Sequence, residues 1–227
     1  MEEGDKMIDK NSIGIQYMQQ GKYEEAAKIF NEIIEQNPKD PIGYINFGNL
    51  LSSIGENVRA IAFFNKAIEI DGSLATAYYG AGNTYYNQED YIKAKDNFEQ
   101  AIKLGLQEAD VYFMLAMSLV QLGQEKLALP YFQRAVELND LDEEAHFQYG
   151  LCLAMLEMVD DAIPHFEKTI HLNDEHPDAY YNLGVAYAFK DNPEKALKMF
   201  DKALQVQPDH FLAANGKKNV EEFFRQH

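Results

Sequence analysis

The sequence predicts an all-α protein made of six similar helix pairs. The main observation is a repeat of 34 residues that runs through most of the 227-residue chain. No segment alternates apolar and polar residues with the period of two that is typical of a strand. Three columns of residues carry the repeat: Gly14, Gly48, Gly82, Ala116, Gly150 and Gly184; Ala26, Ala60, Ala94, Ala128, Ala162 and Ala196; and Phe30, Phe64, Phe98, Phe132, Phe166 and Phe200.

Each 34-residue unit reads as two helices joined by a short turn. In residues 75–108, Tyr78, Ala81 and Tyr85 lie at the spacing of one helical face. A polar turn follows, and a second apolar stripe then begins at Tyr91. Small residues allow two helices to cross closely, so the Gly/Ala and Ala columns predict close crossings. The Phe column is expected to fill the core, since burying such a ring contributes about 1.5–3 kcal/mol.

The turn between the two helices has its own column. It contains Gly21, Gly55 and Gly123, with acidic residues in the other units: Glu89, Glu157 and Asp191. Glycine at this place suits the left-handed conformation that often ends a helix.

One unit resembles a known repeat almost throughout. Its residues Tyr180, Leu183, Gly184, Tyr187, Ala196, Phe200, Ala203 and Pro208 are similar to the tetratricopeptide repeat (TPR) pattern. The resemblance covers about residues 7–210 and implies a right-handed alpha-alpha superhelix, a TPR solenoid of six helix pairs. The closing proline is kept only at Pro38 and Pro208, and Lys10 and His146 replace the usual aromatic residue. The implied repeats are 7–40, 41–74, 75–108, 109–142, 143–176 and 177–210.

The two ends of the chain do not carry the repeat. Residues 1–6 are expected to be frayed. Residues 211–227 lose the repeat but stay amphipathic, with Leu212, Ala213, Gly216, Val220 and Phe223 at helical spacing. A capping helix that covers the last apolar face is therefore expected.

Composition limits the classes of partner. The chain has 37 Asp and Glu against 20 Lys and Arg, a formal net charge of −17. Such a field disfavours nucleic acid and anionic membranes as partners, since both need clustered Lys and Arg. A single cysteine excludes an internal disulfide, and no apolar run approaches the length of a membrane helix. A cytoplasmic location is the default expectation.

No arrangement of residues indicates catalysis. Cys152 lies among Leu151, Leu153 and Met155, as a buried and inert thiol would. The histidines do not form a metal-binding pair on one helix face, and a metal site at His171 and His176 is the weaker reading. We therefore predict no catalytic residue, no metal and no cofactor.

The family resemblance implies that the first helix of each pair lines a concave groove. Amide side chains there would hold the backbone of an extended peptide, whereas a solvated helix face is the alternative. The apolar residues of the C-terminal half would mark a partner site if exposed, with packing on neighbouring helices as the alternative. The predicted groove residues are Asn46, Asn49, Tyr79, Asn83, Tyr86, Phe113, Met117, Phe147, Gln148, Leu151, Tyr181, Asn182 and Phe189; Met155 belongs to the same apolar stretch.

Acidic residues recur where first helices begin. Asp110, Glu144 and Asp178 are 34 residues apart. Their simplest role is to stabilise the helix dipole, by about 0.3–1 kcal/mol each. The alternative is contact with Lys or Arg of a ligand. No Lys or Arg occupies the mapped groove positions, which argues against a clamp for a C-terminal carboxylate.

The resulting prediction is a non-enzymatic adaptor or scaffold, monomeric or weakly homo-oligomeric. Its groove would bind an extended peptide or an amphipathic helix of another cytoplasmic protein, a segment that could carry basic residues. The alternatives are a self-associating structural protein and a regulatory subunit of a separate enzyme.

Overall fold

The computed structural model describes residues 10–225, which form thirteen helices and contain no strand. The expected fraying of residues 1–6 lies outside the described residues. The helices are α1 Lys10–Gln19, α2 Tyr23–Gln36, α3 Pro41–Ser53, α4 Asn57–Ile70, α5 Ala75–Asn87, α6 Tyr91–Lys103, α7 Ala109–Gln121, α8 Glu125–Leu138, α9 Glu143–Met155, α10 Val159–Leu172, α11 Pro177–Phe189, α12 Pro193–Val206 and α13 Phe211–Arg225.

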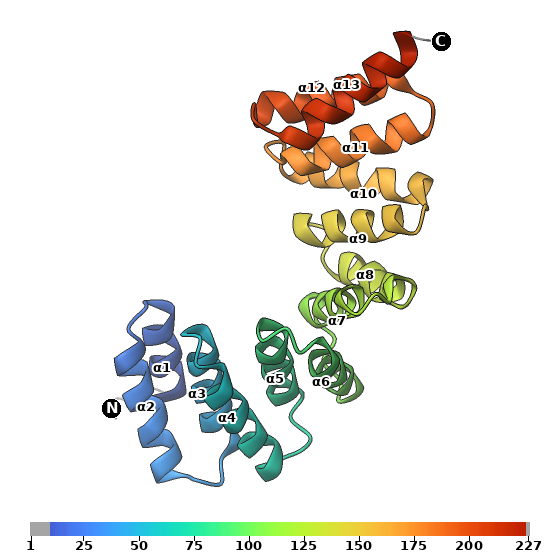
Figure 1. Ribbon diagram of the computed structural model, residues 1–227. Helices are drawn as coiled ribbons and strands as arrows, with labels where there is room; N and C mark the ends of the chain where they lie inside the picture. Colours follow the sequence, from blue (N-terminus) through green and yellow to red (C-terminus); the bar gives the residue numbers. More distant parts are fainter. Residues whose placement is uncertain (1–9, 226–227) are drawn as a thin grey trace, which may run out of the picture. The chain divides into compact units, whose positions relative to one another are not determined.

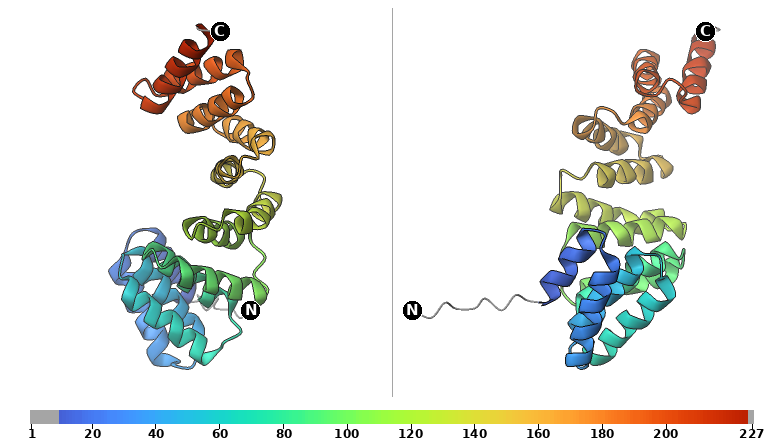
Figure 2. Two further views of the ribbon diagram at one scale, coloured as in Figure 1. Left: turned by 45° about the vertical axis from the view of Figure 1, so that its right-hand side comes forward. Right: turned by 90° about the vertical axis from the view of Figure 1, so that its left-hand side faces the viewer.

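The helices form two compact units, which we call the first unit and the second unit. The first unit contains α1 to α6 and ends at Gln107, and the second begins at Glu108 and contains α7 to α13 (Figure 1). Within each unit, an odd-numbered first helix packs against the second helix that follows it, and each second helix packs on the next first helix. Figure 2 shows the same pairs from two further directions.

The phenylalanine column forms the core of both units. All six rings are at most 1% exposed. A methyl group added to Gly48 would lie 2.9 Å from Cε1 of Phe64, and one added to Gly80 would lie 2.4 Å from the same atom. One ring thus fills the space between two glycines, of its own first helix and of the next. This is why the small-residue column exists: a side chain there would overlap the ring.

The turns have the predicted left-handed backbone. Gly21, Gly55 and Gly123 have φ between +69° and +80°. The acidic residues of the same column also have positive φ, with values of 61° at Glu89, 60° at Glu157 and 51° at Asp191. Because a Cβ atom disfavours this conformation, the three acidic residues occupy a backbone shape that suits glycine better.

The helix N-termini reveal a periodic capping position that sequence reasoning missed. The Asp142 carboxylate accepts from the backbone N–H of Ala145 at 3.0 Å. His176 and His210 follow at intervals of 34 residues, and each Nδ1 atom accepts a backbone N–H three residues later, at 3.1 Å. A ring nitrogen that accepts must be unprotonated. His176 therefore caps its helix through Nδ1, and its spacing from Asp142 was the available signal.

The last helix packs on α11 and α12. Ala213 and Val220 are buried on this inner side, in one cluster with the Phe200 ring. The outer side keeps large apolar residues exposed: Phe211 is 72%, Leu212 51% and Phe223 54% exposed. The helix thus covers Phe200 and presents an apolar surface of its own.

Candidate functional site

The first helices of the first unit present amides that are only partly available. Asn46 donates from Nδ2 to Oδ1 of Asn11 at 2.8 Å, which links α3 to α1. Asn49 is exposed, and Asn83 is half-buried. The predicted amide surface therefore exists at Asn49 and Asn83, whereas Asn46 already has a partner within the protein.

The two predicted tyrosines of this unit are half-buried against their own repeat. The Tyr79 ring lies 6.0 Å from that of Phe98. The Tyr86 ring meets Tyr91 edge to face at 5.2 Å. Their inner faces support the second helix α6, and only their outer parts remain accessible to a ligand.

In the second unit, aromatic residues recur on the first helices at intervals of 34. Phe113, Phe147 and Tyr181 each lie 6.0–6.2 Å from the core phenylalanine of the same repeat. Phe113 and Tyr181 are half-buried. Phe147 is only 9% exposed, because the His176 ring covers it at 4.4 Å. The expectation of an exposed Phe147 is wrong, and packing on neighbouring residues, the alternative, applies to it.

Four further predicted residues are half-buried. Met117 and Leu151 lie on α7 and α9, and Leu151 packs against the core around Phe166. Gln148 donates to the Glu144 carboxylate at 2.8 Å, and Asn182 donates to the Asp178 carbonyl at 2.8 Å. The amides on α9 and α11 therefore bond within their own helices.

The most exposed apolar residues of these helices lie near their C-terminal ends. Met155 on α9 is 60% exposed, and Val185 and Phe189 on α11 are 42% and 67% exposed. Val185 and Phe189 line a hollow of about 120 Å³ together with Asn182 and Glu157. We call Met155, Val185 and Phe189 the apolar patch. It is smaller than the sequence predicted, because the aromatic residues nearer the N-termini are partly buried.

The three periodic carboxylates are exposed at the starts of α7, α9 and α11. Asp110 and Glu144 lie in first turns, where a negative charge favours the helix. Asp178 accepts from His210 Nε2 at 3.0 Å, and its carboxylate is still 59% exposed. α7, α9 and α11 contain no Lys or Arg. The N-terminal ends of these helices are therefore acidic, whereas the apolar patch lies toward their C-terminal ends.

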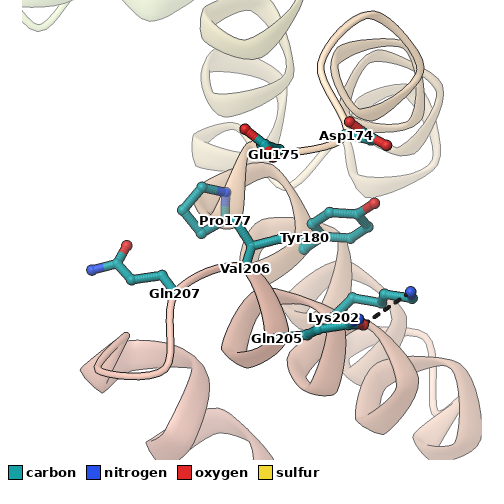
Figure 3. A pocket seen from close by; sticks show the side chains of 8 residues that line it. All are labelled: Asp174, Glu175, Pro177, Tyr180, Lys202, Gln205, Val206 and Gln207. Atoms are coloured by element: carbon teal, nitrogen blue, oxygen red, sulfur yellow. Dashed lines mark hydrogen bonds between the residues drawn. The ribbon is translucent and has the colours of Figure 1, made fainter.

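A larger hollow of about 630 Å³ lies between the start of α11 and the last turns of α12. Figure 3 shows Asp174 and Glu175 on the loop before α11, and Lys202 on α12 across the hollow from them. Lys202 donates to Gln205 at 3.1 Å. The lining is mostly polar and the charges are mixed, so this hollow has no dominant ligand chemistry.

A buried histidine, His146 on α9, faces a half-buried one, His165 on α10. The Nδ1 atoms of His146 and His165 are 3.0 Å apart, so one donates and the other accepts. Burial lowers the pKa of both, that of His165 to about 4. Asp140 partly opposes the shift at His146, and Lys168 adds to it. His165 and Tyr149 line a hollow of about 590 Å³ beside Pro130 and Pro164. Neither proline ends its helix.

The remaining reactive group is inert. Cys152 is 1% exposed, and burial raises the pKa of its thiol to about 11. Such a thiol is protonated near neutral pH and is a poor nucleophile. Within residues 10–225, no three His, Cys, Asp or Glu residues are placed to hold a metal ion. In the same range, no helix combines the length and the apolar character needed to cross a bilayer.

Comparison with known proteins identifies the repeats. Models of the tetratricopeptide repeat match residues 10–40, 79–143, 113–170 and 177–210, and a model of the TPR repeat matches residues 48–89. The TPR repeat-containing protein YrrB of Bacillus subtilis (strain 168) is 59% identical over 39 residues, which span 17% of this chain and 19% of that protein.

Solved structures extend the likeness over most of the chain. The crystal structure of YrrB, described as a TPR protein with an unusual peptide-binding site, is 55% identical, with a TM-score of 0.80 over 85% of this chain and 99% of that one. A structure of Pseudomonas aeruginosa pilF is 16% identical, with a TM-score of 0.78 over 96% of both chains, and shares the fold. The repeats, the helix pairs and the identity to YrrB together show that the chain belongs to the tetratricopeptide repeat family.

Proposed function

We propose that this protein is a non-enzymatic adaptor whose first helices bind a segment of another cytoplasmic protein. The observation that carries the proposal is the apolar patch, because large apolar side chains exposed together mark partner sites. Met155 and Phe189 are 60% and 67% exposed although the rings nearby are packed. The peptide-binding site described for YrrB, at 55% identity, supports the same reading.

The proposed contacts are of three kinds. The apolar patch, with the accessible parts of Phe113, Met117 and Tyr181, would take apolar side chains of the ligand. The amides of Asn49 and Asn83 would bond its backbone in the first unit, since an amide both donates and accepts. Asp110, Glu144 and Asp178 would attract Lys or Arg. Both an extended peptide and an amphipathic helix satisfy these contacts.

The test compares two double variants of the full chain. Met155→Ser with Phe189→Ser removes the two most exposed side chains of the patch. The control, Val58→Ser with Ile92→Ser, removes side chains that are 77% and 61% exposed on second helices of the first unit. Affinity capture from lysate with mass spectrometry is expected to lose its partners with the first pair only. Circular dichroism checks that both variants keep their helicity. Equal capture by wild type and both variants would contradict the proposal.

The surface of α13 supports a second candidate, self-association. Phe211 and Leu212 are 72% and 51% exposed beside each other at its start. Light scattering over a concentration series separates the candidates: a mass that rises with concentration favours self-association, and a monomer at every concentration excludes it. A regulatory subunit of a separate enzyme would bind in the same way as an adaptor, and identification of the captured partner distinguishes the two.

A further inference from the structure

Helix α13 occupies the place of a further first helix in the second unit. Ala213 and Val220 are buried, as are Ala179 and Ala186, the residues 34 positions earlier on α11. Gly216 lies against the Phe200 ring, with its added Cβ at 2.8 Å, in the same way that Gly80 lies against Phe64. Because the inner contacts repeat, the remaining positions of α13 follow the register of α11.

One side of α13 departs from this register. Lys217 and Lys218 stand where α11 has Leu183 and Gly184, both buried in α11. Lys217 pairs with Asp201 at 2.6 Å, and the Lys218 side chain is 69% exposed. A lysine where α11 has the close-packed glycine would block a second helix from packing there. α13 is therefore suited to end the stack of pairs.

The side of α13 that corresponds to the proposed binding face of α11 keeps binding chemistry. Phe223 is the counterpart of Phe189, and both are more than half exposed. Asn215 and Asn219 are exposed amides at the positions of Tyr181 and Val185. Phe211, which is 72% exposed, corresponds to Pro177 and lies outside this set of positions.

We infer that the binding face of the second unit continues onto α13, and that Phe189 and Phe223 are two consecutive anchors for one extended peptide. This inference rests on the proposed function and names its ligand chemistry. Packed helices lie about 8–10 Å apart. An extended chain in the polyproline II conformation rises about 3.1 Å per residue with three residues per turn, so side chains three positions apart lie on one side, about 9 Å from each other. Apolar side chains three positions apart in the ligand therefore match adjacent helices.

The charge of the ligand follows from the groups beside these anchors. Glu157 lines the same hollow as Phe189. Lys190, which follows Phe189, pairs with Asp160, and the two lysines of α13 also pair with acidic residues. These pairs leave Glu157 and the formal net charge of −17 to set the sign of the field at the anchors. α11 itself has no Lys or Arg. The occupant is thus a basic segment with two apolar residues separated by two others.

The test uses a fluorescein-labelled peptide, Gly-Lys-Phe-Ser-Lys-Phe-Lys-Gly, and fluorescence anisotropy with the full chain. Phe189→Ala and Phe223→Ala are each expected to weaken binding about tenfold, as loss of a buried aromatic anchor does. Phe211→Ala on the same helix is the matched control and is expected to bind as wild type. A peptide of the same composition with its two Phe residues adjacent, or with Glu in place of Lys, is expected to bind about tenfold more weakly.

A second variant guards against an effect of Phe223→Ala on folding. Asn215→Arg changes an exposed residue of α13, and its positive charge is expected to repel the basic peptide and weaken binding to a similar extent. If Phe189→Ala weakens binding while Phe223→Ala and Asn215→Arg bind as wild type, the site ends at α11 and only this inference fails. If the peptide does not bind wild type and the Met155/Phe189 variant also keeps its captured partners, the proposed function fails with it.

Discussion

The first helices of the two units share a backbone pattern and differ in charge. α1, α3 and α5 of the first unit contain no Asp or Glu, and their polar surface is made largely of amides and hydroxyls. α7, α9 and α11 of the second unit carry the four carboxylates Asp110, Glu143, Glu144 and Asp178 and no Lys or Arg. The six histidines of the chain also all lie after Glu108.

This difference shows which positions the fold leaves free. Packing needs glycine or alanine where a core ring approaches, as at Gly48 and Gly82. It puts no such demand on exposed positions such as Asn49 and Asp110. Residues at these positions can therefore set the charge of the binding face without disturbing the core.

The largest expected effect tests whether the two units, which differ in surface charge, also unfold independently. Gly80→Val places a branched side chain where even a Cβ lies 2.4 Å from the Phe64 ring. We expect the free energy of unfolding of the first unit to fall by about 3 kcal/mol or more. Hydrogen-exchange mass spectrometry of the full chain should show faster exchange in residues 41–103 and unchanged exchange in 109–225.

The control for this change is Thr76→Val, at an exposed position of the same helix α5. It should leave exchange unchanged, because no core ring lies over an exposed side chain. Equal loss of protection in both units of Gly80→Val would mean that they unfold as one cooperative body.

A smaller effect is expected from acid, and it should fall on the second unit. The pKa values of His146 and His165 are lowered from 6.5, that of His165 to about 4. Between these values the unfolded chain binds more protons than the folded one, so stability falls as pH falls below 6.5. From pH 7.5 to pH 5 we expect the free energy of unfolding of the second unit to fall by about 1–2 kcal/mol. Urea unfolding, combined with hydrogen exchange in each unit, measures this loss.

Two variants test the origin of the acid effect: His165→Gln removes the shifted group, and His171→Gln is its control. His171 is exposed on the same helix α10. With His165→Gln, the free energy of unfolding of the second unit should depend less on pH. With His171→Gln, it should depend on pH as in wild type. A first unit that loses as much stability as the second over this pH range would contradict the assignment.

The smallest effects are expected at the turns. Glu157→Gly and Asp191→Gly in the second unit, and Glu89→Gly in the first, remove a Cβ from a left-handed residue. Each is expected to raise the free energy of unfolding by about 1 kcal/mol. Thermal denaturation should therefore show a larger gain for the two changes of the second unit together than for Glu89→Gly alone.

A glycine placed at an exposed helical position should change the free energy of unfolding in the opposite direction. Glu99→Gly on α6 should lower stability by about 1 kcal/mol, because glycine disfavours a helix. No gain at any of the three turn positions would show that the acidic residues are not strained there.

Much of this architecture is readable from local pattern. The 34-residue period predicted the helix pairs, the buried phenylalanines and the left-handed turns, because each depends on spacing and on the conformational limits of a few residue types. The capping histidines were equally periodic, yet His176 and His210 were missed, since histidine is an uncommon helix cap.

The candidate site was less predictable. The register of the first helices pointed to Phe147 and Phe189 alike, and the two differ in exposure, at 9% and 67%. His176 lies 4.4 Å from Phe147 and covers it. Asn46 is likewise engaged by Asn11 from another helix. Register along a helix does not specify which neighbour covers a side chain.

The sequence by itself determined the repeat, the residues of the core and the absence of basic residues from the mapped groove positions, because these follow from periodicity and composition. Tertiary structure decided which of the candidate residues remain accessible and that His146 pairs with His165. It also decided that, within the described residues, no second helix of its own packs on α13 at Lys217 and Lys218, where α11 has buried residues. Exposure and pairing depend on side chains that are distant in sequence and meet only when helices pack.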